Sequence, residues 1–407
     1  MPFSSLGLSP ALTLAVTAKG YTSPTPVQSQ TIPAALAGSD LLVCAQTGSG
    51  KTAAFGIPLL QKLEQTTLYS PRQLLVLVLV PTRELAAQVA ESLRSIGQHL
   101  KQSIKISAVY GGVSINPQLM ALRSGTDVMV ATPGRLLDLI DHNALNLRSV
   151  HTLVLDEADR LLDLGFSAEI DRILELLPAQ RQSLFLSATF PNKVNALAQR
   201  LLNSPVRIDL KPSAEVAQEI QQTAYAVDSG RRTQLLRHLI QEKAWTRVLV
   251  FVATKHATEI VADKLRKAGI QAEPFHGLLS QGKRTQVLLD FKASRIAVVV
   301  ATDVAARGID IARLPVVVNY DLPRSAVDYT HRIGRTGRAG ESGLAVSFVD
   351  AASAPHFKLI QSRHALSIAL ESEPGFEPTD TAAPPPGTGG IKGKRPSKKD
   401  KLRAALK

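Results

Sequence analysis

Short runs of aliphatic and β-branched residues alternate along the chain with longer segments of helical period. The run Leu74–Val80 is typical of a strand buried on both faces, and Arg83–Leu100 carries leucine and alanine at the spacing of an amphipathic helix. Strands that alternate with helices in this way predict a parallel α/β sheet. The strand candidates of the first half are Leu41–Ala45, Leu74–Val80, Lys105–Tyr110, Asp127–Ala131, Leu153–Leu155 and Ser183–Leu186.

The alternation weakens around Asn203–Gln222, where Pro205 and Pro212 interrupt it, and then restarts. We therefore expect two α/β domains, at residues 1–208 and 223–370, joined by a linker at 209–222. The segments Asp127–Gly134 and Ile296–Asp303 have similar sequences, as expected for two domains of related architecture. The strand candidates of the second half are Arg247–Val252, Gln271–Phe275, Ile296–Ala301, Val316–Tyr320 and Leu344–Val349.

The composition changes again near the C-terminus. From Glu371 onward Pro, Gly and Thr, and then Lys and Arg, replace the alternating pattern, which predicts a disordered tail over residues 371–407. Between Ile391 and Lys407 there are eight Lys or Arg residues and one Asp. Such a tail either holds a nucleic acid loosely by charge or serves only to keep the chain in solution.

Length and composition exclude several classes of protein. The chain has 407 residues, of which 44% are hydrophobic and 20% charged, enough for two domains with apolar cores. Its longest aliphatic run, Leu74–Val80, is far shorter than the ~20 residues that span a bilayer. The N-terminus lacks the pattern of a signal peptide. Cys44 is the only cysteine, which excludes an intrachain disulfide and a cysteine metal cluster. We expect a cytoplasmic protein.

The charge balance indicates a polyanionic partner. Lys and Arg number 47 against 34 Asp and Glu, a formal net charge of +13, and nucleic acid is the commonest polyanion. Basic proteins need not bind nucleic acid, so charge alone leaves this open. Aromatic residues make up only 4% of the chain, which argues against a base-stacking platform. If a nucleic acid binds, we expect contacts mainly with its backbone.

A glycine-rich segment, Ala45–Thr52, lies between a strand candidate and a helix candidate, which is the context of a phosphate-binding loop. Glycines let backbone N–H groups turn toward phosphate oxygens, and the N-terminus of the helix adds a positive dipole. Lys51 is expected to reach the β- and γ-phosphates, and the Thr52 hydroxyl to bind Mg²⁺. Ala45 departs from the usual glycine. The candidate phosphate-loop residues are Ala45, Gln46, Thr47, Gly48, Ser49, Gly50, Lys51 and Thr52.

Three carboxylates, Asp156, Glu157 and Asp159, follow the strand candidate Leu153–Leu155. Ligand sites of open α/β sheets lie at this carboxyl end of the strands. Asp156 is expected to hold Mg²⁺, and Glu157 to orient and deprotonate the water that attacks the γ-phosphorus. The alternative is the solvated start of a helix.

These motifs resemble, in the same order, those of the DEAD-box RNA helicases, named after Asp-Glu-Ala-Asp. The resemblance runs from about Phe3 to Phe357 and implies two RecA-like domains, each a mainly parallel sheet flanked by helices, that bind ATP, Mg²⁺ and RNA. Gly20–Gln28 resembles the Q motif of the family, which implies that Gln28 contacts the adenine edge. Tyr21 would then stack on the adenine ring, with Phe3 at the upstream aromatic position; both aromatics could instead be core residues.

Several further segments resemble the RNA-contact motifs of the family, and each follows a strand candidate. Backbone amides, hydroxyls and helix N-termini bind phosphates without reading sequence, which suits unspecific binding of a strand. Taken singly, a Thr-Pro-Gly segment is more commonly only a turn. The RNA contacts that the resemblance implies are Pro81, Thr82, Arg83, Gly111, Gly112, Thr132, Pro133, Gly134, Arg135, Thr254, Gln281, Arg284 and Thr302.

The remaining motifs imply communication between the two domains. Ser187 and Thr189 resemble the motif that couples hydrolysis to strand separation, which implies hydrogen bonds toward Asp159 and His331 in a closed state. The segment His331–Arg338 packs three arginines and a histidine into eight residues, a cluster that would repel itself without an anion to engage. By the resemblance, Arg335 and Arg338 stabilise charge on the transferred phosphoryl group, and Asp310 contacts the ATP ribose.

The resemblance implies an ATP-dependent RNA helicase that unwinds short duplexes and remodels RNA–protein complexes. Two alternatives share the same motifs: an ATP-gated RNA clamp or scaffold with little unwinding, and a DNA translocase of the same superfamily. The stretch Leu161–Phe166 resembles the bacterial RhlE-like branch, whose members suggest ribosomal or RNA-decay protein partners.

Overall fold

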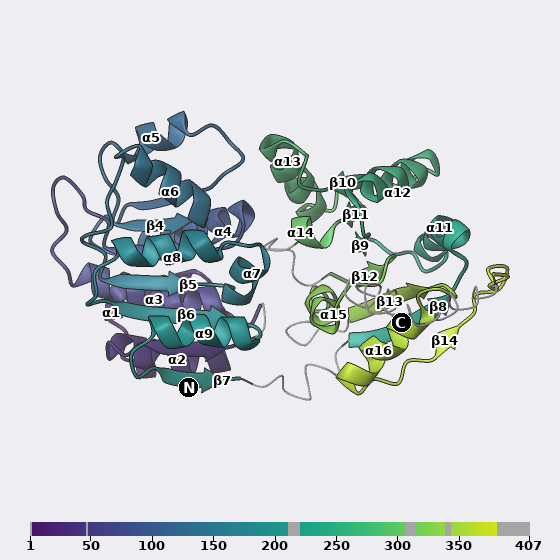
Figure 1. Cartoon of the computed structure of the whole chain (residues 1–407), viewed down its shortest axis with the longest axis horizontal. Helices are drawn as coiled ribbons and strands as arrows, with labels where there is room; N and C mark the ends of the chain where they lie inside the picture. Colours follow the sequence, from purple (N-terminus) through teal and green to yellow (C-terminus); the bar gives the residue numbers. More distant parts are fainter. Residues whose placement is uncertain (1, 46–47, 211–219, 307–313, 338–342, 381–407) are drawn as a thin grey trace, which may run out of the picture.

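The computed structural model describes residues 2–45, 48–210, 220–306, 314–337 and 343–380, which form two lobes side by side (Figure 1). Each lobe contains one sheet of seven strands, and all paired strands within the described residues are parallel. The prediction of two parallel α/β domains is therefore confirmed. All of the predicted strands are present, each to within two residues at either end.

The first sheet has helices on both faces. Its strands are β1 (Leu41–Cys44), β2 (Val76–Leu79), β3 (Ile106–Val109), β4 (Val128–Ala131), β5 (Thr152–Leu155), β6 (Gln182–Ser187) and β7 (Val206–Asp209), in the spatial order β3-β4-β2-β5-β6-β1-β7. One face is covered by η1 (Phe3–Leu6), α1 (Pro10–Ala18), α2 (Pro26–Leu36), α3 (Lys51–Glu64) and α4 (Arg83–Gly97). The other is covered by α5 (Asn116–Leu122), α6 (Pro133–Asp141), α7 (Ala158–Asp163), α8 (Ser167–Leu176) and α9 (Asn192–Leu201).

The second sheet repeats this plan. Its strands are β8 (Ile220–Ala226), β9 (Val248–Phe251), β10 (Ala272–Phe275), β11 (Val298–Ala301), β12 (Val316–Asn319), β13 (Gly343–Val349) and β14 (Leu370–Glu371), in the order β10-β11-β9-β12-β13-β8-β14. The helices are η2 (Ser229–Arg231), α11 (Arg232–Glu242), α12 (Lys255–Lys267), α13 (Gln281–Lys292), α14 (Asp303–Ala306), α15 (Ala326–Ile333) and α16 (Ala354–His364). Helices α11 and α12 pack on one face, and α13, α14, α15 and α16 on the other.

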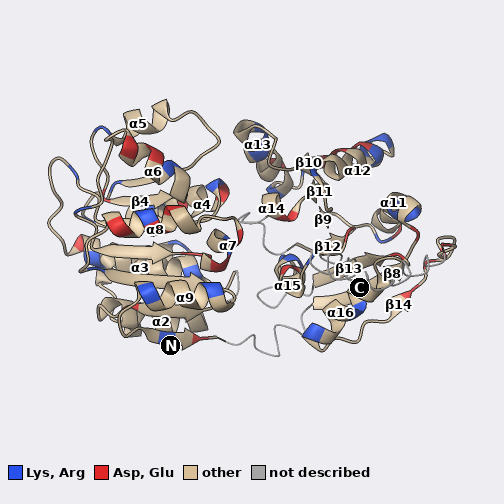
Figure 2. Ribbon diagram, in the orientation of Figure 1, with Lys and Arg blue, Asp and Glu red and all other residues tan. Residues whose placement is uncertain are grey.

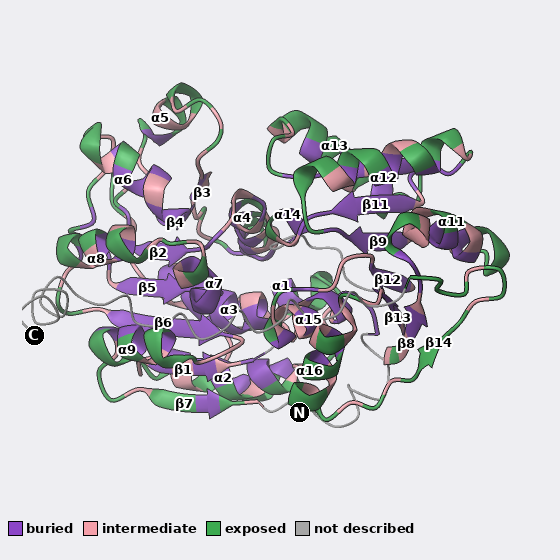
Figure 3. Cartoon of the chain, turned by 45° about the vertical axis from the view of Figure 1, so that its right-hand side comes forward, coloured by how far each residue is buried: buried purple, intermediate pink, exposed green. Residues whose placement is uncertain are grey.

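Burial on both faces explains why the strands read as unbroken apolar runs. In β2, Val76 and Val78 belong to the core beneath α3 and α4, while Leu77 and Leu79 belong to the core on the opposite face. Buried residues accordingly concentrate on the strands (Figure 3), and charged residues lie mainly on the surrounding helices and loops (Figure 2). Among the described residues, no helix is both long and apolar enough to cross a membrane.

Two strands lie where the apolar pattern weakens. Strand β7 pairs with β1, although only Ile208 of its four residues is buried. Strand β8 has the polar sequence Ile-Gln-Gln-Thr-Ala-Tyr-Ala, yet it pairs with β13 along its whole length. Asp209 and residues 220–222, placed in the predicted linker, are thus strand residues, and residues 211–219 lie outside the described residues.

The start of the predicted tail is also packed. The carboxylate of Asp228 accepts hydrogen bonds from the Thr379 amide and hydroxyl and from the Asp380 amide, at 2.8–3.1 Å. The Phe376 ring lies 5.3 Å from the His238 ring and 5.1 Å from the Arg231 guanidinium. The prediction of disorder is therefore wrong for residues 371–380, because a few specific anchors outweigh the Pro- and Gly-rich composition. Residues 381–407 lie outside the described residues.

Arg332 belongs to the arginine cluster for which we expect an anionic partner, and this partner is a carboxylate of the same lobe. Its Nε and Nη2 donate to the two carboxylate oxygens of Asp303 at 2.6 and 2.7 Å, and its Nη1 donates to Asn319 Oδ1 at 3.1 Å. The guanidinium also lies 4.9 Å from the centre of the Phe251 ring. Arg332 is 3% exposed, so this arginine joins α14, α15 and the sheet.

We predict that Arg332→Ala lowers the free energy of unfolding of the second lobe by about 3 kcal/mol, because it leaves the Asp303 carboxylate and the buried Oδ1 atom of Asn319 without their donor. Urea unfolding followed by circular dichroism measures this loss. Arg172→Ala is the matched control, since it removes an exposed ion pair with Asp141 and should cost at most about 1 kcal/mol. Equal losses in the two variants would contradict the structural role of Arg332.

Candidate functional site

Parallel strands bring the segments that follow them to one edge of each sheet. In the first lobe this edge carries the segments after β1, β2, β3, β4, β5 and β6, which contain the predicted nucleotide and RNA motifs. Helices α7 and α15 lie where the two lobes face each other (Figure 1), and residues of both line a common cavity.

The glycine-rich loop turns sharply before α3. Gly48 and Gly50 have φ values of 83° and 96°, a left-handed conformation that favours glycine. Lys51 is the first residue of α3 and is 6% exposed, and its ammonium donates to the Ala45 carbonyl at 2.8 Å. Thr52 is half-buried beside it. A phosphate oxygen can replace the Ala45 carbonyl as the partner of Lys51; Gln46 and Thr47 lie outside the described residues.

The N-terminus of α2 is docked onto this loop. Gln28 Oε1 accepts from the Thr25 amide at 3.0 Å, and Gln28 Nε2 donates to the Gly50 carbonyl at 3.2 Å. The Thr25 hydroxyl donates to the Ser49 carbonyl at 2.8 Å. A Cβ atom on Gly50 would lie 2.5 Å from Gln28 Nε2, so only glycine fits this contact. Sequence reasoning missed Thr25, whose place in the capping pattern Thr-x-x-Gln was the available signal.

The two aromatic residues predicted to lie near the adenine stack on each other. The rings of Phe3 and Tyr21 are 6.3 Å apart with an interplanar angle of 29°. Phe3 is 4% exposed and belongs to the core of the first lobe, against which the half-buried Tyr21 packs. Phe3 is thus a core residue, which was the alternative to an adenine contact, and Tyr21 is the more accessible of the two.

The acidic motif is buried at the start of α7. Asp156, Glu157 and Asp159 are 3%, 6% and 5% exposed. Burial raises the pKa of Asp156 to about 6, and the charges of Glu157 and Asp159 act in the same direction, against the lowering effect of Lys51. Glu157 has φ 50° and ψ 50°, a left-handed conformation that costs a non-glycine residue about 1–2 kcal/mol. Crowded carboxylates of this kind suit a divalent cation.

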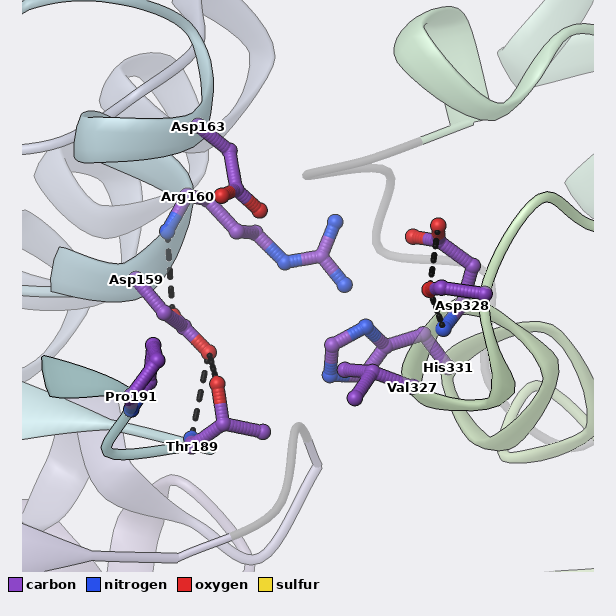
Figure 4. A pocket seen from close by; sticks show the side chains of 9 residues that line it. Asp159, Arg160, Asp163, Thr189, Pro191, Val327, Asp328 and His331 are labelled. Atoms are coloured by element: carbon purple, nitrogen blue, oxygen red, sulfur yellow. Dashed lines mark hydrogen bonds between the residues drawn. The ribbon is translucent and has the colours of Figure 1, made fainter. Parts of the chain in front are cut away.

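Asp159, Ser187 and Thr189 form one hydrogen-bonded group. Asp159 Oδ2 accepts from the Thr189 amide at 3.1 Å and from the Thr189 hydroxyl at 2.8 Å. The Ser187 hydroxyl accepts from the Asp159 amide at 3.3 Å and donates to the Thr189 carbonyl at 2.7 Å. His331 of the second lobe faces this group across a cavity of about 190 Å³ (Figure 4). The predicted coupling residues are therefore brought together.

Helix α15 and the residues after it supply positive charge from the second lobe. Arg335 is 7% exposed and lines a smaller cavity together with His331 and Arg160. Burial and the neighbouring charge of Arg160 lower the pKa of His331 to about 3, so the imidazole is neutral near pH 7. Arg338 and Asp310 lie outside the described residues.

The predicted RNA motifs of the first lobe are in mutual contact. The Gly111 amide donates to the Thr132 hydroxyl at 3.4 Å, and a Cβ atom on Gly112 would lie 2.9 Å from Arg83 Nη1. Arg135 is only 8% exposed and donates to the Val113 carbonyl at 2.7 Å, so its side chain supports this loop. The adjoining residues of these motifs are Pro81 and Thr82 before α4, and Pro133 and Gly134 in the first turn of α6.

The motifs of the second lobe follow three neighbouring strands, β10, β11 and β9. The Thr254 hydroxyl caps α12 by accepting from the Ala257 amide at 3.1 Å, and the Thr302 hydroxyl accepts from the Ala305 amide at 3.4 Å. Gln281 is the first residue of α13. These positions share one edge of the second sheet.

An ion pair links the two sets of motifs across the lobes. Arg284 Nη2 lies 2.8 Å from Glu84 Oε1, and the side chains are 4% and 5% exposed. Arg83 Nε donates to the same Glu84 oxygen at 3.0 Å. Burial lowers the pKa of the Arg284 guanidinium, while Glu84 raises it. Sequence reasoning placed Arg284 at the RNA surface but missed Glu84, for which the pattern of the chain offers no separate signal.

We predict that Glu84→Gln and Arg284→Gln each increase the radius of gyration of the protein with RNA and a non-hydrolysable ATP analogue bound, because each variant removes the ion pair between the lobes. Small-angle X-ray scattering measures this change. The double variant should resemble each single variant, since all three remove the same contact. Arg172→Gln, which affects a pair within the first lobe, is the control; single variants that scatter like this control would show that the pair does not hold the lobes together.

Comparisons with known proteins agree with this placement of motifs. Residues 25–197 match the family described as DEAD/DEAH box helicase, and residues 231–340 match the helicase conserved C-terminal domain. The DEAD-box ATP-dependent RNA helicase CshA of Geobacillus kaustophilus is 42% identical over 347 residues, which cover 85% of this chain and 73% of that protein. The ATP-dependent RNA helicase CshA of Listeria monocytogenes is 41% identical over 359 residues, covering 88% and 68%.

Two solved structures of proteins bound to RNA and a nucleotide have a similar fold over most of the chain. Dbp5 of S. cerevisiae bound to RNA and ADP BeF3 superimposes with a TM-score of 0.80 at 30% identity, covering 93% of this chain and 96% of that chain. Mss116p bound to ssRNA and AMP-PNP also has a TM-score of 0.80, at 29% identity, covering 91% and 78%.

Proposed function

Because the chain belongs to the DEAD-box ATP-dependent RNA helicases, we propose that its hydrolysis of ATP depends on closure of the two RecA-like domains over ATP and RNA. The observation that carries this proposal is the division of the site between the domains. Asp159 and Thr189 lie on one side of the cavity between α7 and α15, and Glu157 directly precedes α7, while His331 lies on the other side and Arg335 lines the adjoining cavity.

In this proposal the loop Ala45–Thr52 holds the triphosphate. Lys51 exchanges the Ala45 carbonyl for phosphate oxygens, and the amides at the start of α3 point toward the same charge. Gln28 contacts the adenine edge, with Tyr21 beside the ring. The contacts of Gln28 and Thr25 with Gly50 and Ser49 would transmit binding of the base to the phosphate loop. Asp310 would contact the ribose.

The residues present fit a magnesium ion bound with the nucleotide. Asp156 is buried beside Glu157 and Asp159, and carboxylate oxygens are the ligands that this ion prefers. Asp156 and the Thr52 hydroxyl would hold the ion, which neutralises charge on the β- and γ-phosphates when bound.

Glu157 is the proposed general base. Its left-handed backbone places it at the N-terminus of α7, directly after Asp156, the proposed magnesium ligand. There it orients one water in line with the bond to be broken and accepts a proton from it. Arg335 and Arg338 supply positive charge to the transferred phosphoryl group only after closure. Closure would bring neutral His331 close to the hydrogen-bonded group of Asp159, Ser187 and Thr189.

RNA would bind along the edge that carries the contact motifs of both domains. Thr82, Gly111, Thr132, Thr254 and Thr302 offer hydroxyls and amides, groups that contact the phosphate backbone without reading sequence. ATP and RNA each favour the closed state, so by linkage each strengthens the binding of the other. A bound strand that follows both domains is bent away from duplex geometry, which separates it from its complement.

Three finer assignments are also proposals. ATP and RNA, the ligands proposed above, support a cytoplasmic location, and the formal net charge of +13 supports partners in ribosome assembly or RNA decay. Leu161–Phe166 favours the RhlE-like branch, whereas the relatives reported above are named CshA, so this assignment rests on one short stretch. For the domain limits 1–208 and 223–370, we propose that the first domain ends with β7, at Asp209, and that the second begins with β8, at Ile220.

Steady-state ATP hydrolysis with single-stranded RNA, matched DNA or no nucleic acid tests the function. We expect RNA to stimulate hydrolysis strongly and DNA to do so far less, because the complexes of Dbp5 and Mss116p contain RNA and the 2′-hydroxyl distinguishes the two polymers. The apparent affinity for RNA should fall between low and high salt, since the contacts are with phosphates. Equal stimulation by DNA would contradict an RNA-specific helicase.

We predict that Glu157→Gln lowers the rate of hydrolysis at least about 100-fold, because it removes the general base, while ATP and RNA still bind. The complex should then stay closed, and the release of labelled RNA in the presence of ATP should be slower than from the wild type. Glu175→Gln, an exposed change on α8, is the matched control. Release at the wild-type rate would overturn the proposed cycle.

We predict that Lys51→Ala abolishes ATP turnover and weakens ATP binding with little change in the thermal midpoint, since the ammonium makes a single hydrogen bond to the described residues, with the Ala45 carbonyl. Binding of a fluorescent ATP analogue measures the first effect, and a circular dichroism melt measures the second. Lys193→Ala, at an exposed position on α9, serves as the control. Retained turnover would show that the phosphate loop is misassigned.

A further inference from the structure

Arg160 is a buried cation without adequate partners. It lies in α7 directly after the acidic motif and is 2% exposed. Its Nε is 3.4 Å from Glu157 Oε2, yet none of its three guanidinium nitrogens makes a hydrogen bond to another described residue, and neither does that glutamate oxygen. A buried charge in this state costs several kcal/mol. Since native proteins rarely leave such groups unsatisfied, a partner present only during the reaction is indicated.

The guanidinium reaches into the space between the domains. Arg160 lines the cavity of about 190 Å³ together with Asp159 and Thr189, and it also lines the smaller cavity that contains Arg335. Figure 4 shows its guanidinium directed away from the first domain, toward Asp328 and His331 of the second. The unsatisfied donors of Arg160 and the unsatisfied acceptor of Glu157 thus lie side by side, and Arg160 extends from this pair to the cavity.

This pair of groups suits a ligand that both accepts and donates hydrogen bonds. Monobasic phosphate does so, because its charged oxygens accept from a guanidinium and its P–OH groups donate to a carboxylate. Hydrolysis produces this ion at the same place. Water oxygen bonds to the γ-phosphorus, the bond to the bridging oxygen breaks, and its electron pair stays on ADP. The proton that Glu157 takes from the water then passes to the product, giving ADP and monobasic phosphate.

We propose that Arg160 and Glu157 form a transient site for the inorganic phosphate produced by hydrolysis, at the inner end of an exit route through the cavity between the domains. The proposal rests on the role of Glu157 as the general base. Asp159, Asp163 and Asp328 also line the cavity, so a phosphate that leaves Arg160 meets negative charge. These carboxylates favour the monobasic over the dibasic ion and keep binding weak, as release of a product requires.

The test is inhibition of RNA-stimulated ATP turnover by added inorganic phosphate, with ionic strength held constant by KCl. Losing the charge-assisted hydrogen bonds of Arg160 should raise the inhibition constant for phosphate about 10-fold or more in Arg160→Gln. Arg160→Lys, which keeps the charge, should show a smaller increase. Arg172→Gln, a change in an exposed arginine of α8, should behave as the wild type. An inhibition constant in Arg160→Gln equal to that of the control would overturn the proposal.

A second measurement separates release from chemistry. In a single turnover with saturating RNA, rapid quench reports hydrolysis and a fluorescent phosphate sensor reports release. We expect the delay between the two signals to shorten in Arg160→Gln relative to the wild type. Loss of the hydrolysis step itself in both Arg160 variants would overturn the proposal, because Arg160 would then act in the chemistry. Failure of the proposed function has a different signature, namely undiminished hydrolysis by Glu157→Gln.

Folding is checked independently. Arg160→Gln removes the ion pair with Glu157 but no hydrogen bond to a described residue, so its thermal midpoint should fall much less than that of Arg332→Ala, which loses hydrogen bonds as well. A large fall in that midpoint would mean that Arg160 has a structural partner, and it would contradict the premise of an unsatisfied cation.

Discussion

The parallel direction of the strands is the constraint on which the site depends. Every segment that follows a strand emerges at the same edge of its sheet, so motifs far apart in sequence become neighbours. The phosphate loop follows β1, the acidic motif follows β5, and Ser187 ends β6, the strand between them. Apolar residues on both faces hold these strands in place, as β2 illustrates with side chains that alternate between two cores. The chemistry is therefore positioned by packing well away from the reacting atoms.

Charge at the facing edges is the second organising feature. Burial, together with the charges of Glu157 and Asp159, raises the pKa of Asp156, and Arg160 is buried without hydrogen bonds to the described residues. Each of these arrangements is unfavourable by itself and becomes favourable when a cation, a phosphate group or the second domain supplies the opposite charge. Arg284 and Glu84 show the other case, in which the opposite charge is already present across the domains. Ligand binding and domain closure thus provide partners for charged groups that the fold buries without them.

Sequence pattern predicted the regular part of the fold well. Strands such as β2 and β11 are continuous apolar runs buried on both faces, and such runs have few other interpretations. Strand β8 was missed because it lies near the edge of its sheet and is mostly polar, and the packed residues 371–380 were missed because their anchors are single contacts with Asp228 and His238. Long-range pairing of this kind leaves no periodic trace in the sequence.

The motifs predicted which residues form the candidate site, but they did not predict all the partners of those side chains. Motif position located Lys51, Glu157 and Thr189, but it did not show that Gln28 holds the phosphate loop or that Arg332 is satisfied within its own domain. Nor did it single out Arg160, whose only signal was its place directly after the acidic motif. Whether a charged side chain finds a partner depends on three-dimensional neighbours, which pattern alone does not supply.

The central claim is that the catalytic groups of the two domains meet only when ATP and RNA are both bound. Single-molecule energy transfer between dyes at exposed positions of each domain, such as Gln180 and Ser362, measures this meeting once Cys44 has been replaced by serine. The account predicts one compact state with a non-hydrolysable ATP analogue and RNA together, and not with either alone. Stimulation of ATP hydrolysis by RNA without any change in the interdomain distance would contradict it.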